Sequence, residues 1–300
     1  MFSKEQVITI FSVIDEFCIE FYDHLDSLSI GSQPKRKPSL STSEVMTILV
    51  LFQLSGVRCF KWFYNEYLLK GYLAGDFPDL VSYNRFVELK KRVVLPMAIF
   101  AKTMATGQCT GISFVDSTPI RVCDIKRIFN HKVFDGIATR GKSTMGWFYG
   151  FKLHLVVNDM GEIIDFQITR ANVDDRQPLK ENLLKKIWGR LYGDKGYIGK
   201  QLCHALFEQG IHFATGTRKN MKNMLMPLWD KVLLRKRSII ETINDQLKNI
   251  CMIEHSRHRS FHNFINNLLA GLIAYSFLPK KPSIKYDFCL PENTNQLAMF

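Results

Sequence analysis

The sequence lacks paired cysteines. Its seven cysteines are odd in number and scattered, and none forms a Cys-x-x-Cys pair. This excludes the zinc-binding and dithiol redox motifs that such pairs mark. We expect reduced, partly buried thiols at Cys18, Cys59, Cys109, Cys123, Cys203, Cys251 and Cys289.

Long apolar runs are also lacking. The longest, Val45 to Leu54 and Leu268 to Leu278, are shorter than the ~18 residues that a membrane-spanning helix needs. The N-terminus has no basic segment followed by an uninterrupted apolar core, so it does not resemble a secretory signal. No Gly-x4-Gly-Lys-Ser/Thr loop is present, which excludes the usual ATP-binding motif. We therefore expect a cytoplasmic protein with no membrane partner and no nucleotide cofactor.

Acidic residues are too few to balance the basic ones. The 300 residues include 28 Asp and Glu against 40 Lys and Arg, which gives a formal net charge of +12. Such a surplus favours a polyanionic partner such as nucleic acid, although a basic protein without that role would have the same composition. Hydrophobic residues make up 46% and charged residues 23%, as in an ordinary globular protein, and the length allows two modest domains.

Helical patterns dominate the first third of the chain, where apolar residues recur at intervals of three and four. Helices are expected at residues 4–28, 42–54, 61–69 and 83–94. Ser41 and Glu44 provide the capping chemistry for the second of them. Residues 1–105 are therefore expected to form a helical region, which either binds nucleic acid or is only a helix bundle.

A strand pattern begins near Gly111. Strands are expected at residues 112–115, 147–157, 162–169, 190–193 and 211–215, and helices at residues 178–188 and 200–209. The turn sequence from Asn158 to Gly161 joins the second and third strands as a hairpin. This order predicts an α/β domain with a mixed sheet, in which three antiparallel strands precede strands reached through crossover helices. Residues 280–300, which are rich in proline, are expected to form a surface tail.

Three carboxylates stand out in this framework. Asp116 and Asp194 each follow an expected strand, where α/β folds place reactive groups, although either could be an ordinary turn or cap residue. Glu241 lies in a helical segment in which Arg237, Glu241 and Lys248 fall within about 40° of one another. Taken alone, that charged face is better explained as a solvated, ion-paired helix surface.

The motifs around these residues resemble those of a known family. Phe114-Val115-Asp116-Ser117-Thr118-Pro119, Gly193-Asp194-Lys195-Gly196-Tyr197 and Arg237-x3-Glu241-x6-Lys248 are similar to the three signatures of bacterial DDE transposases. The length and layout look most like the insertion sequence 982 family. The resemblance covers about residues 110–275 and implies a ribonuclease-H-like catalytic domain, which we expect at residues 106–279, with the helical region 1–105 as the DNA-end-binding part.

The resemblance also implies a mechanism. Asp116, Asp194 and Glu241 would be both the catalytic residues and the ligands of two Mg²⁺ or Mn²⁺ ions, and Arg237 and Lys248 would lie beside DNA phosphates. The enzyme would cleave phosphodiester bonds at insertion-sequence ends and join the 3′-hydroxyl to target DNA by in-line transfer, working on double-stranded DNA as a homodimer. The alternatives are a nuclease without strand transfer and a non-catalytic DNA-binding regulator of transposase origin.

The chain departs from the family at one position and offers other acidic candidates at several. Leu234 occupies a position where related transposases often have a tyrosine. Asp245 lies one turn after Glu241 and is the strongest rival for its role. Asp174 and Asp175 are better explained as caps of the helix expected from Pro178. Asp124 and Asp135 fall in a polar segment with basic neighbours.

Basic residues gather immediately before Glu241. Seven lie between positions 218 and 240 with Asp230 as their only acidic neighbour, a net excess of six. A second cluster contains His255, Arg257, His258, Arg259 and His262, and its spacing completes no tetrahedral zinc set. Trp229 could stack on a base or fill the core. The resulting DNA-binding candidates are Lys219, Lys222, Arg235, Arg237, Lys248, Arg257 and Arg259.

Overall fold

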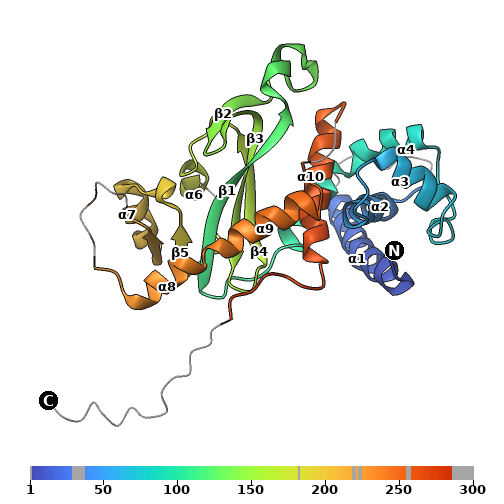
Figure 1. The fold of residues 1–300 in the computed structure, drawn as a ribbon. Coiled ribbons are helices and arrows are strands. Elements are labelled where there is room, and N and C mark those ends of the chain that lie inside the picture. The colour runs from blue at the N-terminus through green and yellow to red at the C-terminus, as the bar shows by residue number, and fades with distance from the viewer. Residues whose placement is uncertain are drawn as a thin grey trace, which may run out of the picture.

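The N-terminal region of the computed structural model is helical, as its sequence predicts (Figure 1). The structure describes residues 2–28, 38–181, 183–217, 221, 225–254 and 258–285. Helix α1 (Lys4–Ser27) and helix α2 (Thr42–Leu54) each begin with a capping box, formed at α2 by Ser41 and Glu44. The expected helices at residues 4–28 and 42–54 are thereby confirmed.

The next two expected helices occur in the right places but are not regular. Helix α3 (Phe60–Phe63) continues as a π-helix, η1 (Tyr64–Leu69). Helix α4 (Tyr83–Leu89) passes through a 3₁₀ turn, η2 (Lys90–Val93), into α5 (Val94–Thr103). Pro96 accounts for the break, because a proline fits the first turn of a new helix but not the interior of a long one.

A mixed, partly parallel sheet follows, as the strand pattern predicts. Its strands are β1 (Ile112–Cys123), β2 (Thr139–Ser143), β3 (Gly146–Asn158), β4 (Ile163–Arg170), β5 (Gly189–Gly193) and β6 (Ile211–Thr215). They lie in the order β2-β3-β1-β5-β6, and β4 also pairs with β3. Strands β1, β5 and β6 are parallel, whereas β3 is antiparallel to β1, β2 and β4.

Two strand predictions are wrong. Strand β1 does not end at Val115 but continues to Cys123, so Asp116 lies within it and pairs with Leu155 of β3. Pro119 is tolerated there because β5 pairs only with residues 112–115, and the missing N–H breaks no ladder on that side. Strand β2 was not expected, since its sequence, Thr-Arg-Gly-Lys-Ser, is polar and contains glycine.

The helix expected over residues 178–188 is also wrong in its extent. Helix α6 covers only Gln177–Glu181, and residues 183–186 form turns. Leu183, Leu184 and Ile187 are nevertheless buried beneath the sheet, which explains their apolar pattern. By contrast, the expected turn from Asn158 is confirmed, because its side-chain oxygen accepts the backbone N–H groups of Met160 and Glu162 at 3.1 and 2.8 Å.

Both faces of the sheet are covered. Successive residues of a strand point to opposite faces. Phe114 belongs to the main core with Ile240, whereas Val115 belongs to a second core with Leu179 and Leu202. Helices α6 and α7 (Lys200–Glu208) therefore cover one face, and α9 (Ser238–Asn249) crosses the other after α8 (Leu228–Lys236).

Helix α10 (Phe261–Ser276) lies between the sheet region and the N-terminal helices (Figure 1). It contacts α2, α5 and α9. Its Tyr275 hydroxyl donates to the Gly161 carbonyl in the β3–β4 turn at 2.6 Å. Among the helices that the structure describes, none has the length and apolar character to cross a membrane.

Candidate active site

Asp116 and Asp194 occupy neighbouring positions on the sheet. The parallel pairing of β1 with β5 ends where Val115 faces Gly193, and each aspartate is the next residue. Asp194 leaves the strand and precedes the 3₁₀ turn η5 (Lys195–Tyr197), with its backbone oxygen accepting the Tyr197 N–H at 3.0 Å. The two carboxylates therefore start from adjacent backbone positions at the carboxyl edge of a parallel pair.

Helix α9 brings Glu241 to the same place. The Arg237 guanidinium lies 3.0 Å from a Glu241 carboxylate oxygen and 4.0 Å from an Asp194 carboxylate oxygen. Asn244, one turn further on, donates its amide to Asp116 at 3.4 Å. A single helix face thus reaches all three acidic residues, while Ile240, Ile243 and Leu247 on its other side are buried in the main core.

The pKa of the Asp116 carboxyl is raised to about 6. Burial is the main cause, because a charged carboxylate is poorly solvated there, and the charges of Asp194 and Glu241 act in the same direction. The Arg237 charge and a hydrogen bond from the Ser117 backbone act in the opposite direction. These effects show that Asp194, Glu241 and Arg237 lie within electrostatic range of Asp116, and that mutual repulsion favours protonation of one carboxyl.

The donor set suits a hard cation. Carboxylate oxygens are the ligands that Mg²⁺ and Mn²⁺ prefer, and three negative side chains at one place repel one another until a cation lies among them. In the arrangement seen, Arg237 is that cation. As they stand, no three histidine, cysteine or acidic side chains of the described residues meet closely enough to hold a metal ion, and Arg237 lies 3.0 Å from Glu241 and 4.0 Å from Asp194.

Two further residues at this site were missed by the sequence analysis. Asn244 lies on the helix face of Arg237, Glu241 and Lys248 at a spacing of seven from Arg237, so helical periodicity could have identified it. Tyr197 is buried beneath the carboxylates. Burial raises the pKa of its phenol well above the usual value, and the charges of Asp116 and Asp175 add to this. Nothing in the sequence pattern separates Tyr197 from an ordinary core tyrosine.

Lys248 is partly buried and is held by contacts within the protein. Its ammonium group donates to the Pro119 carbonyl at 2.8 Å and lies 3.3 Å from a Glu254 carboxylate oxygen. The other Glu254 oxygen accepts the backbone N–H of Arg121 at 2.9 Å. Lys248 therefore fixes the end of α9 to β1, and so holds the helix that carries Glu241 against the strand that carries Asp116.

The remaining basic candidates are spread out. Arg235 is exposed at the end of α8, two residues before Arg237. Arg259 is exposed just before α10, near Tyr83, whose pKa is raised by burial and lowered by the Arg259 charge. Lys219, Lys222 and Arg257 lie outside the described residues. Trp229 is partly buried and packs against the main core, as the core alternative expects.

The rival carboxylates have other partners. Asp245 is exposed and accepts a hydrogen bond from Asn249 at 2.6 Å, and it is Glu241 rather than Asp245 that raises the pKa of Asp116. Asp174 accepts the backbone N–H of Arg176 at 2.9 Å ahead of α6, as expected of a cap. Asp175 does not cap the helix in this way but pairs with Lys152 at 2.9 Å.

Comparison with known proteins agrees with this geometry. No curated protein matches the chain at a significant level. A family model described as the transposase DDE domain matches residues 106–261, which is more than half of the 300 residues and spans β1, β5 and α9. The match therefore covers Asp116, Asp194 and Glu241 together with the elements that position them, and the chain belongs to the family of transposases with a DDE domain.

Proposed function

We propose that the protein is a DNA transposase of the insertion sequence 982 type that cleaves the ends of its element and joins the freed 3′-hydroxyl to target DNA. The observation that carries this proposal is the approach of Asp116, Asp194 and Glu241 to one another around Arg237. The mixed sheet, with a catalytic acid on its first strand, a second after a parallel neighbour and a third on a late helix, supports a ribonuclease-H-like arrangement.

Asp116, Asp194 and Glu241 would hold two Mg²⁺ or Mn²⁺ ions, whose charge stabilises the attacking and leaving oxygens of an in-line displacement. Other residues of the protein keep these carboxylates in place. Lys248 fixes α9 to β1, and Asn244 orients the Asp116 carboxylate. Arg237, once released from the carboxylates, is near enough to neutralise a phosphate at the same place.

The DNA path follows from the charged groups around this centre. Arg235 and Arg237 would contact phosphates next to the carboxylates, and Lys219 and Lys222 belong to the same basic segment of the sequence. Lys248 would act indirectly, by holding α9 and its Glu241 in place. Arg257 and Arg259 would contact the DNA nearer the N-terminal helices, which bind the element end. Two ends must be handled together, so the enzyme works as a homodimer on double-stranded DNA in the bacterial cytoplasm.

A pair of substitutions on one helix tests the proposal. Glu241→Gln removes a carboxylate from the centre, whereas Asp245→Asn removes an exposed one a single turn away. With Mg²⁺ and a plasmid that carries the gene and its flanking DNA, we expect Glu241→Gln, Asp116→Asn and Asp194→Asn to lower strand cleavage on the order of 100-fold or more. Asp245→Asn should keep it, and metal-free DNA affinity should hold in all four variants.

The outcomes separate the proposal from its alternatives. Cleavage retained in the three site variants, or lost equally in Asp245→Asn, would refute the three-carboxylate centre. Cleavage by the wild type without joining to a second DNA would identify a nuclease. No cleavage by the wild type in Mg²⁺ or Mn²⁺, with DNA binding intact, would identify a regulator.

A further inference from the structure

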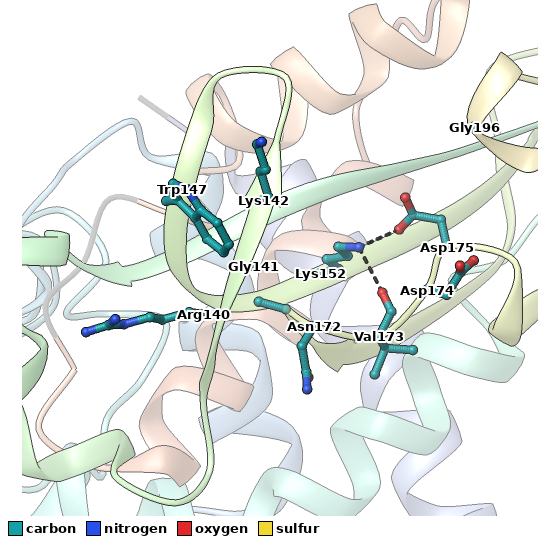
Figure 2. Close-up of a pocket in the computed structure, with 11 residues that line it drawn as sticks. Arg140, Gly141, Lys142, Trp147, Lys152, Asn172, Val173, Asp174, Asp175 and Gly196 are labelled. Atoms are coloured by element: carbon teal, nitrogen blue, oxygen red, sulfur yellow. Dashed lines mark hydrogen bonds and ion pairs between the residues drawn. The ribbon is translucent and has the colours of Figure 1, made fainter.

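A cleft of about 380 Å³ lies against strands β2 and β3 (Figure 2). Strand β2 contributes Arg140, Gly141 and Lys142 to its wall, and β3 contributes Trp147 and Lys152. The segment after β4 and the turn after β5 complete the lining with Ala171, Asn172, Val173, Asp174, Asp175 and Gly196. We call this the hairpin cleft, because the β2–β3 hairpin forms its outer wall.

The hairpin turns its aromatic and basic side chains outward. Lys142 and Trp147 are cross-strand partners, and Arg140 is two residues before Lys142, so all three lie on one face. Gly141, between Arg140 and Lys142, faces the opposite way, because a Cβ atom on it would come within 2.4 Å of the Ala171 carbonyl oxygen. Trp147 is 60% exposed, although burying a tryptophan is strongly favourable. Its flat face is therefore available to a partner.

Among the described residues, some charged side chains of the hairpin cleft have ion-pair partners and others have none. Both of its carboxylates already have cations, since Asp174 pairs with Arg176 at 2.6 Å and Asp175 pairs with Lys152 at 2.9 Å. Figure 2 shows Lys152 directed at Asp175 and at the Val173 carbonyl, which it reaches at 2.8 Å.

The other two cations of the cleft lie over aromatic rings. The Arg140 guanidinium lies 5.6 Å from the ring centre of Phe129, which is itself 87% exposed, and the Lys142 ammonium lies 5.9 Å from that of Trp147. Neither has an ion pair with a carboxylate of the described residues. Each of these two cations thus lies over an exposed aromatic ring and is not paired with a described carboxylate.

One end of the hairpin cleft lies near the candidate carboxylates. Gly196, which lines the cleft, is two residues after Asp194. The charges of Asp175 at the cleft and of Asp116 both act on the pKa of the buried Tyr197 phenol, after burial itself, so both carboxylates lie within electrostatic range of Tyr197. A strand that leaves the active site past Gly196 would enter the hairpin cleft directly.

We propose that the hairpin cleft binds an unpaired nucleotide of the DNA strand that is cut at the active site. The base stacks on Trp147 and the flanking phosphates lie against Arg140 and Lys142. This inference rests on the proposed function, because it takes its strand from the proposed DNA substrate.

Its chemistry favours an unpaired strand over a duplex. Base stacking on exposed aromatic rings beside cations is the usual mode of single-strand binding, since every base has a flat face that pairing and stacking hide in a duplex. The volume of about 380 Å³ is near the lower end of ligand clefts, which suits one base and its sugar. A terminal base at a cut end is also the cheapest to separate from its partner, because it has stacking on one side only.

Binding without divalent metal tests the inference apart from catalysis. The probes are a single-stranded oligothymidylate, a strand of the same length with abasic sites throughout, and a blunt duplex. Trp147→Ala should weaken oligothymidylate binding about 5- to 150-fold, the loss of one stacked base, and leave abasic-strand binding unchanged. Trp147→Phe should keep most of the affinity. Trp188→Ala is the matched control, since Trp188 is 59% exposed but precedes the opposite end of β5 from Asp194.

A second measurement tests the proposed phosphate contacts of Arg140 and Lys142. Arg140→Gln with Lys142→Gln should flatten the salt dependence of oligothymidylate binding by about 0.7 units of slope for each lost contact. The inference is overturned if Trp147→Ala weakens all three probes equally, if it weakens none, or if the slope is unchanged. Cleavage by the wild-type chain is read separately, so loss of the inference leaves the proposed function standing. Absence of cleavage would remove the proposed function and with it the cut strand, whereas the oligothymidylate titrations would still show whether the cleft binds a base.

Discussion

Asp116 is a buried carboxyl whose negative charge the neighbouring residues compensate only in part. Burial and two neighbouring carboxylates raise its pKa to about 6, while Arg237 lowers it only in part. At neutral pH the folded protein therefore holds an ionised carboxylate at a place where burial and neighbouring negative charges disfavour ionisation. Such strain is typical of metal sites, where the bound ion provides the missing compensation.

Replacing the Asp116 carboxylate with a neutral amide gives a first prediction. Without divalent metal, Asp116→Asn should stabilise the protein by about 1–3 kcal/mol at pH 8, because the neutral amide avoids both the burial cost and the repulsion. Added Mg²⁺ or Mn²⁺ should raise the melting temperature of the wild type, since it binds only the folded state, and should raise that of the variant much less.

Thermal melts with and without metal measure both effects. Asp245→Asn is the control, because it removes the same charge from an exposed position and should keep the metal-dependent rise. If Asp116→Asn has a lower melting temperature than the wild type and still responds fully to metal, Asp116 has a structural role and does not hold the metal.

At the scale of elements, Asp230 attaches helix α8 to the sheet. Its buried carboxylate accepts from Tyr192 at 2.7 Å, lies 3.0 Å from Arg190 and lies 3.0 Å from His212. These partners come from β5 and β6, so one side chain joins two strands to the helix that leads into α9. Burial acts to raise the pKa of Asp230, but the hydrogen bonds and the positive charges outweigh it, and the pKa is lowered overall.

Asp230→Asn should therefore be destabilising. Breaking this cluster should cost about 1–3 kcal/mol, because the Asp230 carboxylate is buried but the Arg190 and His212 side chains are 42% and 56% exposed, so that water compensates part of their charge. Because the pKa of Asp230 is lower in the folded state, its contribution is present above pH ~4 and is lost as the pH falls below that value. The difference from wild type should shrink over the same range.

Chemical unfolding at several pH values between 3 and 7 measures this difference. Glu208→Gln, which removes an exposed carboxylate paired with His204, should cost less than about 1 kcal/mol at any of them. A small, pH-independent effect of Asp230→Asn would contradict the assignment.

The elements also show where sequence reasoning succeeds. The helix face of Arg237 and Glu241 was predictable because the apolar residues of α9 follow one period and are buried on one side. Strand β2 was not, because its pairing with β3 and the close approach of Gly141 to Ala171 matter more than side-chain hydropathy. The hairpin cleft depends on segments distant in the chain, so only the folded structure could bring Trp147 close to Gly196.

At the scale of the whole molecule, the N-terminal helices and the catalytic region share a core. One continuous set of buried residues runs from Val7 in α1 to Tyr275 in α10. The buried Gln53 of α2 donates to the Asn267 side chain at 2.6 Å, and Asn266 donates to the Lys90 carbonyl at 2.5 Å. The sequence marks a change of pattern near residue 105, but it could not show that α10 returns to pack against the first region.

This shared core predicts cooperative unfolding. Helix α10 is buried on nearly all sides, so removing residues 1–105 would expose the surface that faces α2 and α5, and would leave the Asn267 and Asn266 side chains without Gln53 and Lys90. We expect the full chain to unfold in one transition, with far-ultraviolet and near-ultraviolet circular dichroism changing together. A chain of residues 106–300 should aggregate or lack a cooperative melt. Two separated transitions in the full chain, or a cooperative melt of the shortened one, would show instead that the catalytic region is stable alone and that the N-terminal helices are an independent unit.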